Sequence, residues 1–318
     1  MKHRFLILAV IAAVAIPTGS AAAVIEPSAT YLFAQKDSAS LYLDIYDPAE
    51  GSQTQIDGRM KPTILFMFGG GFTHGSRDDE YFNKWFRLMT QEGYRIVSID
   101  YRVGLKGIKG AGVNMKFIKA LRNAINIAVE DLFTATNFII DNAAALNIDP
   151  SNIVISGSSA GAITAMQAEW EICNGRELAR VLPEGFNYTG VMSFSGAVFS
   201  DKGAIKYASE PCPMLLFHGT DDKIVPYNKI QMFRLCFSGA NDLAKALKKR
   251  GSVYRIYRYK GHGHEISADM EFFVDKETEF IEENVMKGIK ASSDSLVSDS
   301  ALPIPDWAKG QDYKNLYD

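Results

Sequence analysis

Short apolar runs alternate with segments of helical periodicity along most of this chain, and that alternation restricts the architectures it can adopt. Strand-like runs occupy residues 41–46, 63–68, 95–99, 153–155, 190–194, 214–217 and 253–259. Helical patterns separate most of them, around residues 81–91, 115–146, 160–171, 241–250 and 271–286. Apolar strands that alternate with helices predict an α/β fold, with a mostly parallel sheet covered by helices on both faces. Ligands of such sheets bind at the carboxyl ends of strands, so functional residues are expected just after the strands.

The N-terminus has the pattern of an export signal. Lys2, His3 and Arg4 precede a short apolar run over residues 5–16, and three alanines at 21–23 form a cleavage site. We therefore predict a signal peptide over residues 1–23 and an exported mature protein, periplasmic or secreted, without stable membrane insertion. The apolar run is short for a bilayer span, and an uncleaved anchor is the alternative.

Length and composition predict one catalytic domain over residues 24–287. Such a length is ordinary for a large α/β domain, and a hydrophobic content of 47% suffices for a sizeable core. Residues 288–301 are rich in Ser, Asp and Ala and are predicted to be a linker. Residues 302–318 would then be a tail that either packs on the domain or stays mobile.

Charge and cysteine content limit the partners. A net charge of −3, with no basic cluster beyond residues 248–250, argues against a nucleic-acid partner. The spacing of Cys173, Cys212 and Cys236 suits no zinc site, and we expect buried, small apolar residues, although an exported protein could pair two of them. We predict neither a cofactor nor a metal.

A glycine-flanked serine stands at an abrupt strand-to-helix junction. In "NIVISGSSAGAITAM", residues 152–166, Ser159 has Gly157 and Gly161 two positions away on each side. This arrangement is typical of a nucleophile elbow, in which the serine hydroxyl stands clear of the sheet edge and the glycines allow close approach of strand and helix. An ordinary glycine-rich turn is the alternative.

Three glycines follow the strand-like run 63–68. The amides of Gly70 and Gly71, together with the amide of Ala160 after the serine, could converge on a developing oxyanion. A flexible turn is the alternative, but the occurrence of this glycine segment together with the serine elbow favours the oxyanion hole.

A serine nucleophile needs a base, and the base needs an acid that orients it. "HGTDDKIVP" follows the strand-like run 214–217, and "KGHGHE" follows the run 253–259. The order serine, acid, histidine is that of α/β-hydrolases. We expect one of His262 and His264 to be the base and the other to be a structural histidine. A metal-binding histidine pair is the alternative.

These motifs together resemble an exported α/β-hydrolase of the carboxylesterase kind. The chain is similar to hormone-sensitive-lipase-like enzymes and to feruloyl and acetyl-xylan esterases over roughly residues 40–285. The segments "LYLDIYDP", "FGGGF", "VSIDYR", "IDPSNIVISGSSAGA", "HGTDDKIVP" and "GHGHEI" occur in family order. The resemblance implies an α/β-hydrolase fold and a serine esterase.

The resemblance also assigns roles within the motifs. It implies Ser159 as nucleophile, Asp222 rather than Asp221 as acid, and His264 rather than His262 as base. Gly70, Gly71 and Ala160 match the oxyanion donors, and His218 matches a structural position.

Two departures bear on the subfamily. Phe68 stands where the family usually has a histidine that braces the glycine loop, and "VSIDYRV" lacks the alanine-proline continuation of the hormone-sensitive-lipase group. No gap between the motifs holds a large cap domain. The longest candidate cover is residues 227–240, with Met232, Phe233 and other apolar side chains that either belong to the core or roof the site.

A lightly covered cleft and export favour a small-molecule or polysaccharide ester as substrate, such as acetyl or feruloyl groups on carbohydrate. A serine peptidase or amidase remains an alternative, because triad geometry does not determine the leaving group. A non-catalytic binding protein of the same fold is the third alternative.

Overall fold

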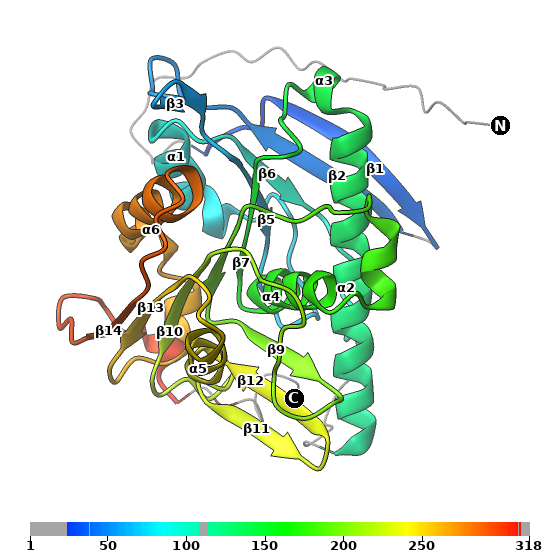
Figure 1. Cartoon of the computed structure of the whole chain (residues 1–318), viewed down its shortest axis with the longest axis vertical. Coiled ribbons are helices and arrows are strands. Elements are labelled where there is room, and N and C mark those ends of the chain that lie inside the picture. The colour runs from blue at the N-terminus through cyan, green and yellow to red at the C-terminus, as the bar shows by residue number, and fades with distance from the viewer. Residues whose placement is uncertain (1–23, 38, 108–113, 311, 313–318) are drawn as a thin grey trace.

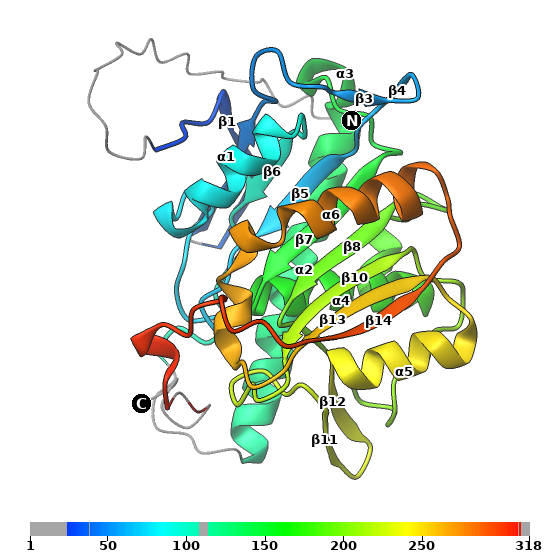
Figure 2. The same cartoon turned by 90° about the vertical axis from the view of Figure 1, so that its left-hand side faces the viewer.

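The computed structural model describes residues 24–37, 39–107, 114–310 and 312. Its centre is a nine-stranded sheet in the order β1-β2-β6-β5-β7-β8-β10-β13-β14 (Figures 1 and 2). The strands are β1 (Ala29–Lys36), β2 (Ala39–Tyr46), β5 (Thr63–Met67), β6 (Ile96–Ile99), β7 (Ile153–Ser158), β8 (Gly190–Phe194), β10 (Met214–Gly219), β13 (Tyr254–Tyr259) and β14 (Ser293–Val297). β1 and β2 are antiparallel to their neighbours, and every pair from β6 to β14 is parallel. The predicted mostly parallel sheet is therefore confirmed.

Helices cover both faces of this sheet. α1 (Asn83–Gln91) and α6 (Val274–Phe280) lie on one face, whereas α2 (Met115–Asp141) and α4 (Ala160–Cys173) lie on the other (Figures 1 and 2). α5 (Ala240–Arg250) packs on β13, α3 (Ala143–Leu146) follows α2, and a π-helical segment, η5 (Ile281–Met286), continues α6. The strands β5, β7, β8 and β10 are buried along their whole length, which explains why they are continuous apolar runs rather than alternating ones.

α2 illustrates how local sequence determines an element. Asn114 caps its first turn, because the side-chain oxygen accepts hydrogen bonds from the amides of Lys116 and Phe117. Helix α3 ends at Asn147, whose φ of 52° is the left-handed conformation common after helices. The predicted helical segment 115–146 is thus two helices that meet at Asn142.

Smaller elements complete the fold. A second sheet has the order β11-β12-β9, formed by β11 (Lys229–Met232), β12 (Leu235–Gly239) and β9 (Ala197–Ser200). β3 (Gln55–Ile56) and β4 (Arg59–Met60) form a short hairpin. The 3-10 turns are η1 (Glu80–Phe82), η2 (Glu177–Val181), η3 (His264–Ser267), η4 (Met270–Phe272) and η6 (Asp306–Ala308).

One expectation about the C-terminal region is wrong. Residues 288–301 were expected to form a linker, but Ser293–Val297 is strand β14, paired in parallel with β13 at the edge of the main sheet. The sheet therefore extends past residue 287. Leu302 is buried against the core, so at least this part of the tail packs on the domain.

The remaining expectations concern the N-terminus and the cysteines. The predicted signal peptide, residues 1–23, lies outside the described residues. None of the helices in the described part of the chain combines the length and the hydropathy needed to cross a bilayer. Cys173, Cys212 and Cys236 are buried free thiols.

Candidate active site

Ser159 occupies a sharp turn between β7 and α4. Its backbone has φ 50° and ψ −113°, and its amide donates a hydrogen bond to the carbonyl of Phe194 at 2.9 Å. A Cβ at Gly161 would lie 2.1 Å from the carbonyl oxygen of Met67, and a Cβ at Gly157 would lie 2.3 Å from the carbonyl carbon of Gly161. Only glycine fits these two positions, so the flanking glycines allow the strand and the helix to meet at the strained serine.

The structure brings Ser159, His264 and Asp222 together from the carboxyl ends of three parallel strands. The Ser159 hydroxyl Oγ lies 2.8 Å from His264 Nε2, and His264 Nδ1 lies 2.8 Å from Asp222 Oδ2. His264 opens the turn η3 after β13, and Asp222 follows β10. With the proton on Nδ1, the imidazole donates to the carboxylate and presents Nε2 as the acceptor for the serine proton. This is the hydrogen-bonded chain that activates a serine nucleophile.

Asp222 is held as an ionised carboxylate. Its Oδ1 accepts hydrogen bonds from the amides of Ile224 and Val225 at 2.9 and 3.0 Å, and His218 Nε2 lies 3.2 Å from Oδ2. Burial alone would raise the pKa of Asp222, but the nearby charge of His264 and the hydrogen bonds from His218 and His264 outweigh it and hold that pKa below its usual range. The neighbouring Asp221 is exposed, and it accepts a hydrogen bond from the hydroxyl of Thr220 instead.

The second histidine of the loop has other contacts. His262 is buried, with Nδ1 3.1 Å from Glu265 Oε1 and Nε2 3.4 Å from the carbonyl of Asp299. Glu265 also accepts a hydrogen bond from the amide of Gly263. These contacts fold the loop that carries His264, and they give His262 the position of a brace.

The glycine loop after β5 lies beside the nucleophile. Gly69 is close enough that a Cβ there would lie 3.5 Å from the Cβ of Ser159. Gly70 and Gly71 have φ values of 103° and 61°, and the Gly70 carbonyl accepts a hydrogen bond from the amide of Thr73, which closes the turn. Phe68, at the position where the resemblance implies a histidine, is buried.

Two of the three expected oxyanion donors line the same cavity as Ser159. They are Gly71 and Ala160, whereas Gly70 does not line that cavity in the described part of the chain. Ala160 is the first residue of α4, so its amide has no acceptor within the helix and lies at the positive end of the helix dipole.

An apolar cavity of about 420 Å³ opens beside the serine. Its apolar walls come from the glycine loop, α2, α4, β9, the loop after β10 and the β11–β12 hairpin: Phe72, Phe117, Ile118, Leu121, Ile163, Phe199, Ile224, Val225, Pro226, Ile230, Met232, Leu235, Cys236 and Phe237. The hairpin within residues 227–240 therefore roofs the site, and its tip residue Phe233 is 91% exposed. The α2 and β9 residues were not identified from the sequence, because their apolar side chains have the spacing of ordinary core positions.

Comparisons with known proteins agree with this architecture. A phospholipase/carboxylesterase family model matches residues 119–281, about half of the chain, and a BD-FAE family model matches residues 43–174. Lipase 2 of Geotrichum candidum is 27% identical over 216 residues, 67% of this chain and 34% of that protein. Fumonisin B1 esterase of Sphingopyxis macrogoltabida is 27% identical over 124 residues, 38% of this chain and 21% of that protein. The chain thus spans about a third or less of the length of these relatives.

Solved structures share the fold. Butyrate-bound esterase 2 of Thermogutta terrifontis superposes with a TM-score of 0.56 at 21% identity, covering 80% of this chain and 93% of that one. The same esterase phosphoramylated by tabun gives a TM-score of 0.55 at 21% identity, with 80% and 93% covered. The matched sheet, the serine elbow and the family model together establish that the chain belongs to the phospholipase/carboxylesterase family of α/β-hydrolases.

Proposed function

We propose that this protein hydrolyses carboxylic esters through an acyl-enzyme on Ser159. The observation that carries the proposal is the hydrogen-bonded chain from Ser159 through His264 to Asp222 at the edge of an apolar cavity. His264 Nε2 takes the hydroxyl proton as Oγ attacks the ester carbonyl, and the same proton then goes to the departing alcohol. Water, activated by the same histidine, releases the acid.

Charge that develops on the carbonyl oxygen requires amide donors. Gly71 and Ala160 border the cavity, and Gly70 lies in the same loop as Gly71. Asp222 keeps the imidazole in the tautomer that accepts at Nε2 and stabilises the imidazolium that forms. Each step uses side chains or amides of this chain.

The acyl group is proposed to be aromatic, as in a feruloyl ester of a plant polysaccharide. The cavity is apolar, and Phe72, Phe117 and Phe237 are among its lining residues, so a phenylpropenoyl group would bury more surface there than an acetyl group. The lipase and esterase names of the relatives support ester hydrolysis as the reaction. Export of the enzyme, which the N-terminal pattern supports, would bring it to such a polymer.

Four substrates test the proposal: methyl ferulate, methyl acetate, 4-nitrophenyl acetate and glycyl-prolyl 4-nitroanilide. We expect hydrolysis of the esters, with kcat/KM higher for methyl ferulate than for methyl acetate. In Ser159→Ala, kcat/KM for methyl ferulate should fall by on the order of 10⁴-fold or more while the protein stays folded. Cleavage of the anilide alone would identify a peptidase or amidase instead. A wild-type protein that turns over none of the four and does not react with a fluorophosphonate would contradict catalysis by Ser159.

Export is proposed separately and has its own test. We expect N-terminal sequencing of the native protein, recovered outside the cytoplasm, to begin near Val24. Recovery of Met1 from a cytoplasmic fraction would contradict it.

A further inference from the structure

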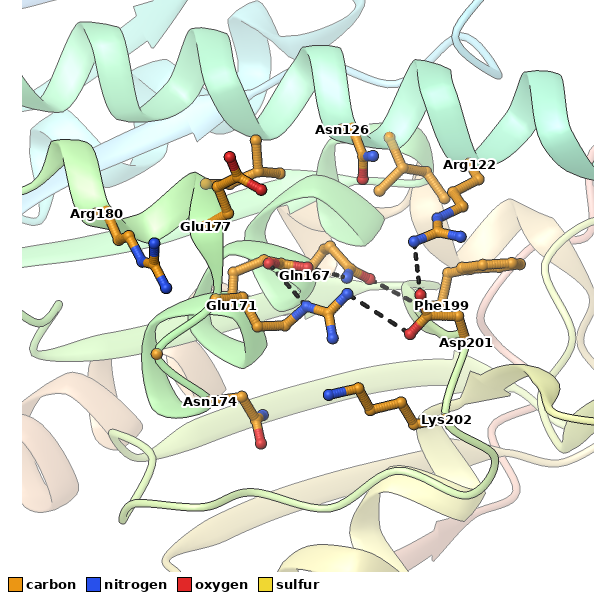
Figure 3. Close-up of a pocket in the computed structure, with 14 residues that line it drawn as sticks. Arg122, Asn126, Gln167, Glu171, Asn174, Glu177, Arg180, Phe199, Asp201 and Lys202 are labelled. Carbon is orange, nitrogen blue, oxygen red and sulfur yellow. Dashed lines mark hydrogen bonds and ion pairs between the residues drawn. The ribbon is translucent and has the colours of Figure 1, made fainter.

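A second cavity, of about 490 Å³, lies on the α2 and α4 side of the sheet (Figure 3). Its walls come from α2, the C-terminal half of α4, the turn η2 and the segment that ends β9. The apolar cavity beside Ser159 is called the catalytic cavity below. Unlike it, the second cavity is lined mainly by charged and amide side chains: Arg122, Asn126, Gln167, Glu171, Asn174, Arg176, Glu177, Arg180, Asp201 and Lys202. We call it the polar cavity.

The polar cavity is the neighbour of the catalytic cavity along the same two helices. On α2, Leu121 lines the catalytic cavity and Arg122 the polar one, and on α4 the change occurs between Ile163 and Gln167. Phe199 lines both cavities. Gln167 lies seven positions after Ala160, so the polar cavity begins about 10 Å along the helix from Ala160. The two cavities therefore adjoin at Phe199.

Some of the charged side chains of the polar cavity pair with one another, and we call these ion pairs the frame of the cavity. Arg122 pairs with Asp201 at 2.6 Å, and Arg176 pairs with Glu171 at 3.1 Å and with Asp201 at 3.5 Å. The Arg176 guanidinium also stacks over the ring of Trp170, 4.7 Å from its centroid. Dashed lines in Figure 3 mark the pairs of this frame.

Other polar groups at the same cavity have no such partner. Arg180, Lys202 and Glu177 are exposed and Asn126 is half-buried, and among the described residues their side chains make neither an ion pair nor a hydrogen bond. Arg180 and Lys202 enter the cavity from different walls, η2 and the segment after β9 (Figure 3). The cavity therefore offers two cations, one carboxylate and one amide to a ligand.

This set of groups selects for a particular ligand chemistry. Arg180 and Lys202 favour a carboxylate, and a guanidinium can bind one through two parallel hydrogen bonds. A bare anion such as phosphate would also face the carboxylate of Glu177, which is unpaired among the described residues, repels an anion and accepts hydrogen bonds from a donor. A sugar acid supplies both an anionic group and hydrogen-bond donors, because its carboxylate binds the cations and its hydroxyls donate to the carboxylate of Glu177.

We propose that the polar cavity is a subsite for the alcohol part of the ester substrate, a saccharide that carries a uronic acid. The proposal rests on the proposed esterase function, and it identifies what the enzyme recognises beyond the acyl group. The alcohol part begins at the ester carbon beside Ser159 and would pass Phe199, which lines both cavities, to reach the polar one.

Three feruloyl esters with the same acyl group test it: methyl ferulate, a feruloylated xylosyl-glucose and a feruloylated xylosyl-glucuronic acid. We expect wild-type kcat/KM to be at least about ten-fold higher for the acidic disaccharide ester than for the neutral one, since hydrogen bonds to charged groups are the stronger ones. In Arg180→Ala/Lys202→Ala this preference should vanish while methyl ferulate turnover stays within about two-fold, as neither side chain touches the triad. Rising ionic strength should also weaken the preference.

Lys245→Ala is the matched control, because Lys245 is an exposed cation of α5 that lines neither cavity. It should retain the preference for the acidic ester. Calorimetry with the free acidic disaccharide gives a readout without turnover: Ser159→Ala should bind it, and Ser159→Ala/Arg180→Ala/Lys202→Ala should not.

Failure of this proposal is distinguishable from failure of the esterase function. Hydrolysis of methyl ferulate with equal rates for the acidic and neutral esters would refute the subsite and leave the esterase intact. A preference that persists in the double variant would place acidic-sugar recognition elsewhere. Absence of turnover of all three esters would contradict the esterase function instead, and calorimetry would still decide whether the polar cavity binds the sugar acid.

Discussion

Tyr101 stacks on Phe68 with ring centroids 4.2 Å apart, and its hydroxyl donates a hydrogen bond of 2.8 Å to the Phe68 carbonyl. Both side chains are buried, and Phe68 immediately precedes the glycine loop beside Ser159. The ring of Phe68 also fills the space next to Gly75, where a Cβ would lie 2.5 Å from it. A stacked pair with one hydrogen bond therefore braces the loop at the position where the resemblance implies a histidine.

We predict that Tyr101→Phe lowers kcat/KM for methyl ferulate by several-fold, because the Phe68 carbonyl loses its partner and the glycine amides lose part of their support. The free energy of unfolding should also fall by about 1 kcal/mol, the usual cost of one buried hydrogen bond. Tyr188→Phe is the matched control. It also removes a buried hydroxyl contact, the one of 2.7 Å from Tyr188 to Thr136, but Tyr188 lies just before the amino end of β8 rather than beside the glycine loop. Equal losses of activity in the two variants would show that Tyr101 acts through global stability alone.

Asp222→Asn should lower kcat/KM by on the order of 10⁴-fold, because the amide cannot hold the imidazole in its accepting tautomer. Asp221→Asn should change it little, since Asp221 is exposed and contacts Thr220. Steady-state kinetics of both variants, with circular dichroism as a check on folding, decide between the two carboxyls. A larger loss in Asp221→Asn would show that the acid is misassigned by one residue.

The two histidines of the loop allow a similar pair of variants. His264→Ala should abolish ester hydrolysis, since it removes the only imidazole within hydrogen-bond distance of Ser159 among the described residues. His262→Ala should cost about ten-fold or less in kcat/KM, since its contact with Glu265 braces the loop. Thermal unfolding should show the larger destabilisation for His262→Ala. If His262→Ala is inactive and His264→Ala still turns over, the assignment of the base is wrong.

The parallel sheet and the grouping of Ser159, Asp222 and His264 could be predicted because each depends on local sequence. Buried parallel strands are continuous apolar runs, and the residues that follow them meet at one edge of the sheet. Topology therefore explains why the motifs meet, whereas the choice of Asp222 and His264 within them came from the resemblance. Their catalytic roles remain predictions that the variants above test.

Other features depend on contacts that local sequence does not encode. Strand β14 has the sequence SDSLV, and its exposure alternates because successive side chains point to opposite faces of the sheet and one face is more exposed. Its polar residues have the composition of a linker, so only its pairing with β13 identifies it as a strand. The polar cavity is assembled from α2, α4, η2 and the end of β9, and none of these segments carries a motif of its own. Both features follow from which elements the fold places side by side.

The last prediction concerns Asp269, a buried carboxyl that follows the His264 turn. Its Oδ2 has no hydrogen-bond partner among the described residues. Burial, together with the charges of Glu271 and Glu265, raises its pKa to about 7. The folded protein therefore keeps this proton at a pH where the unfolded chain, with an ordinary pKa near 3.8, has lost it.

The sign of the effect follows from proton linkage. Below about pH 4 the carboxyl is protonated in both states and contributes no difference, whereas from pH 4 to 7 it destabilises the fold increasingly, and above pH 7 the cost is constant. Asp269→Asn removes the titration. Its free energy of unfolding should match that of the wild type near pH 4 and exceed it by more than about 1 kcal/mol at pH 8, given about 1.4 kcal/mol per pKa unit.

Chemical denaturation of both proteins between pH 4 and pH 8 measures this, and Glu184→Gln, at an exposed carboxyl, is the control that should show no such trend. A constant difference across the pH range would mean that Asp269 does not titrate between the folded and unfolded states as its burial implies.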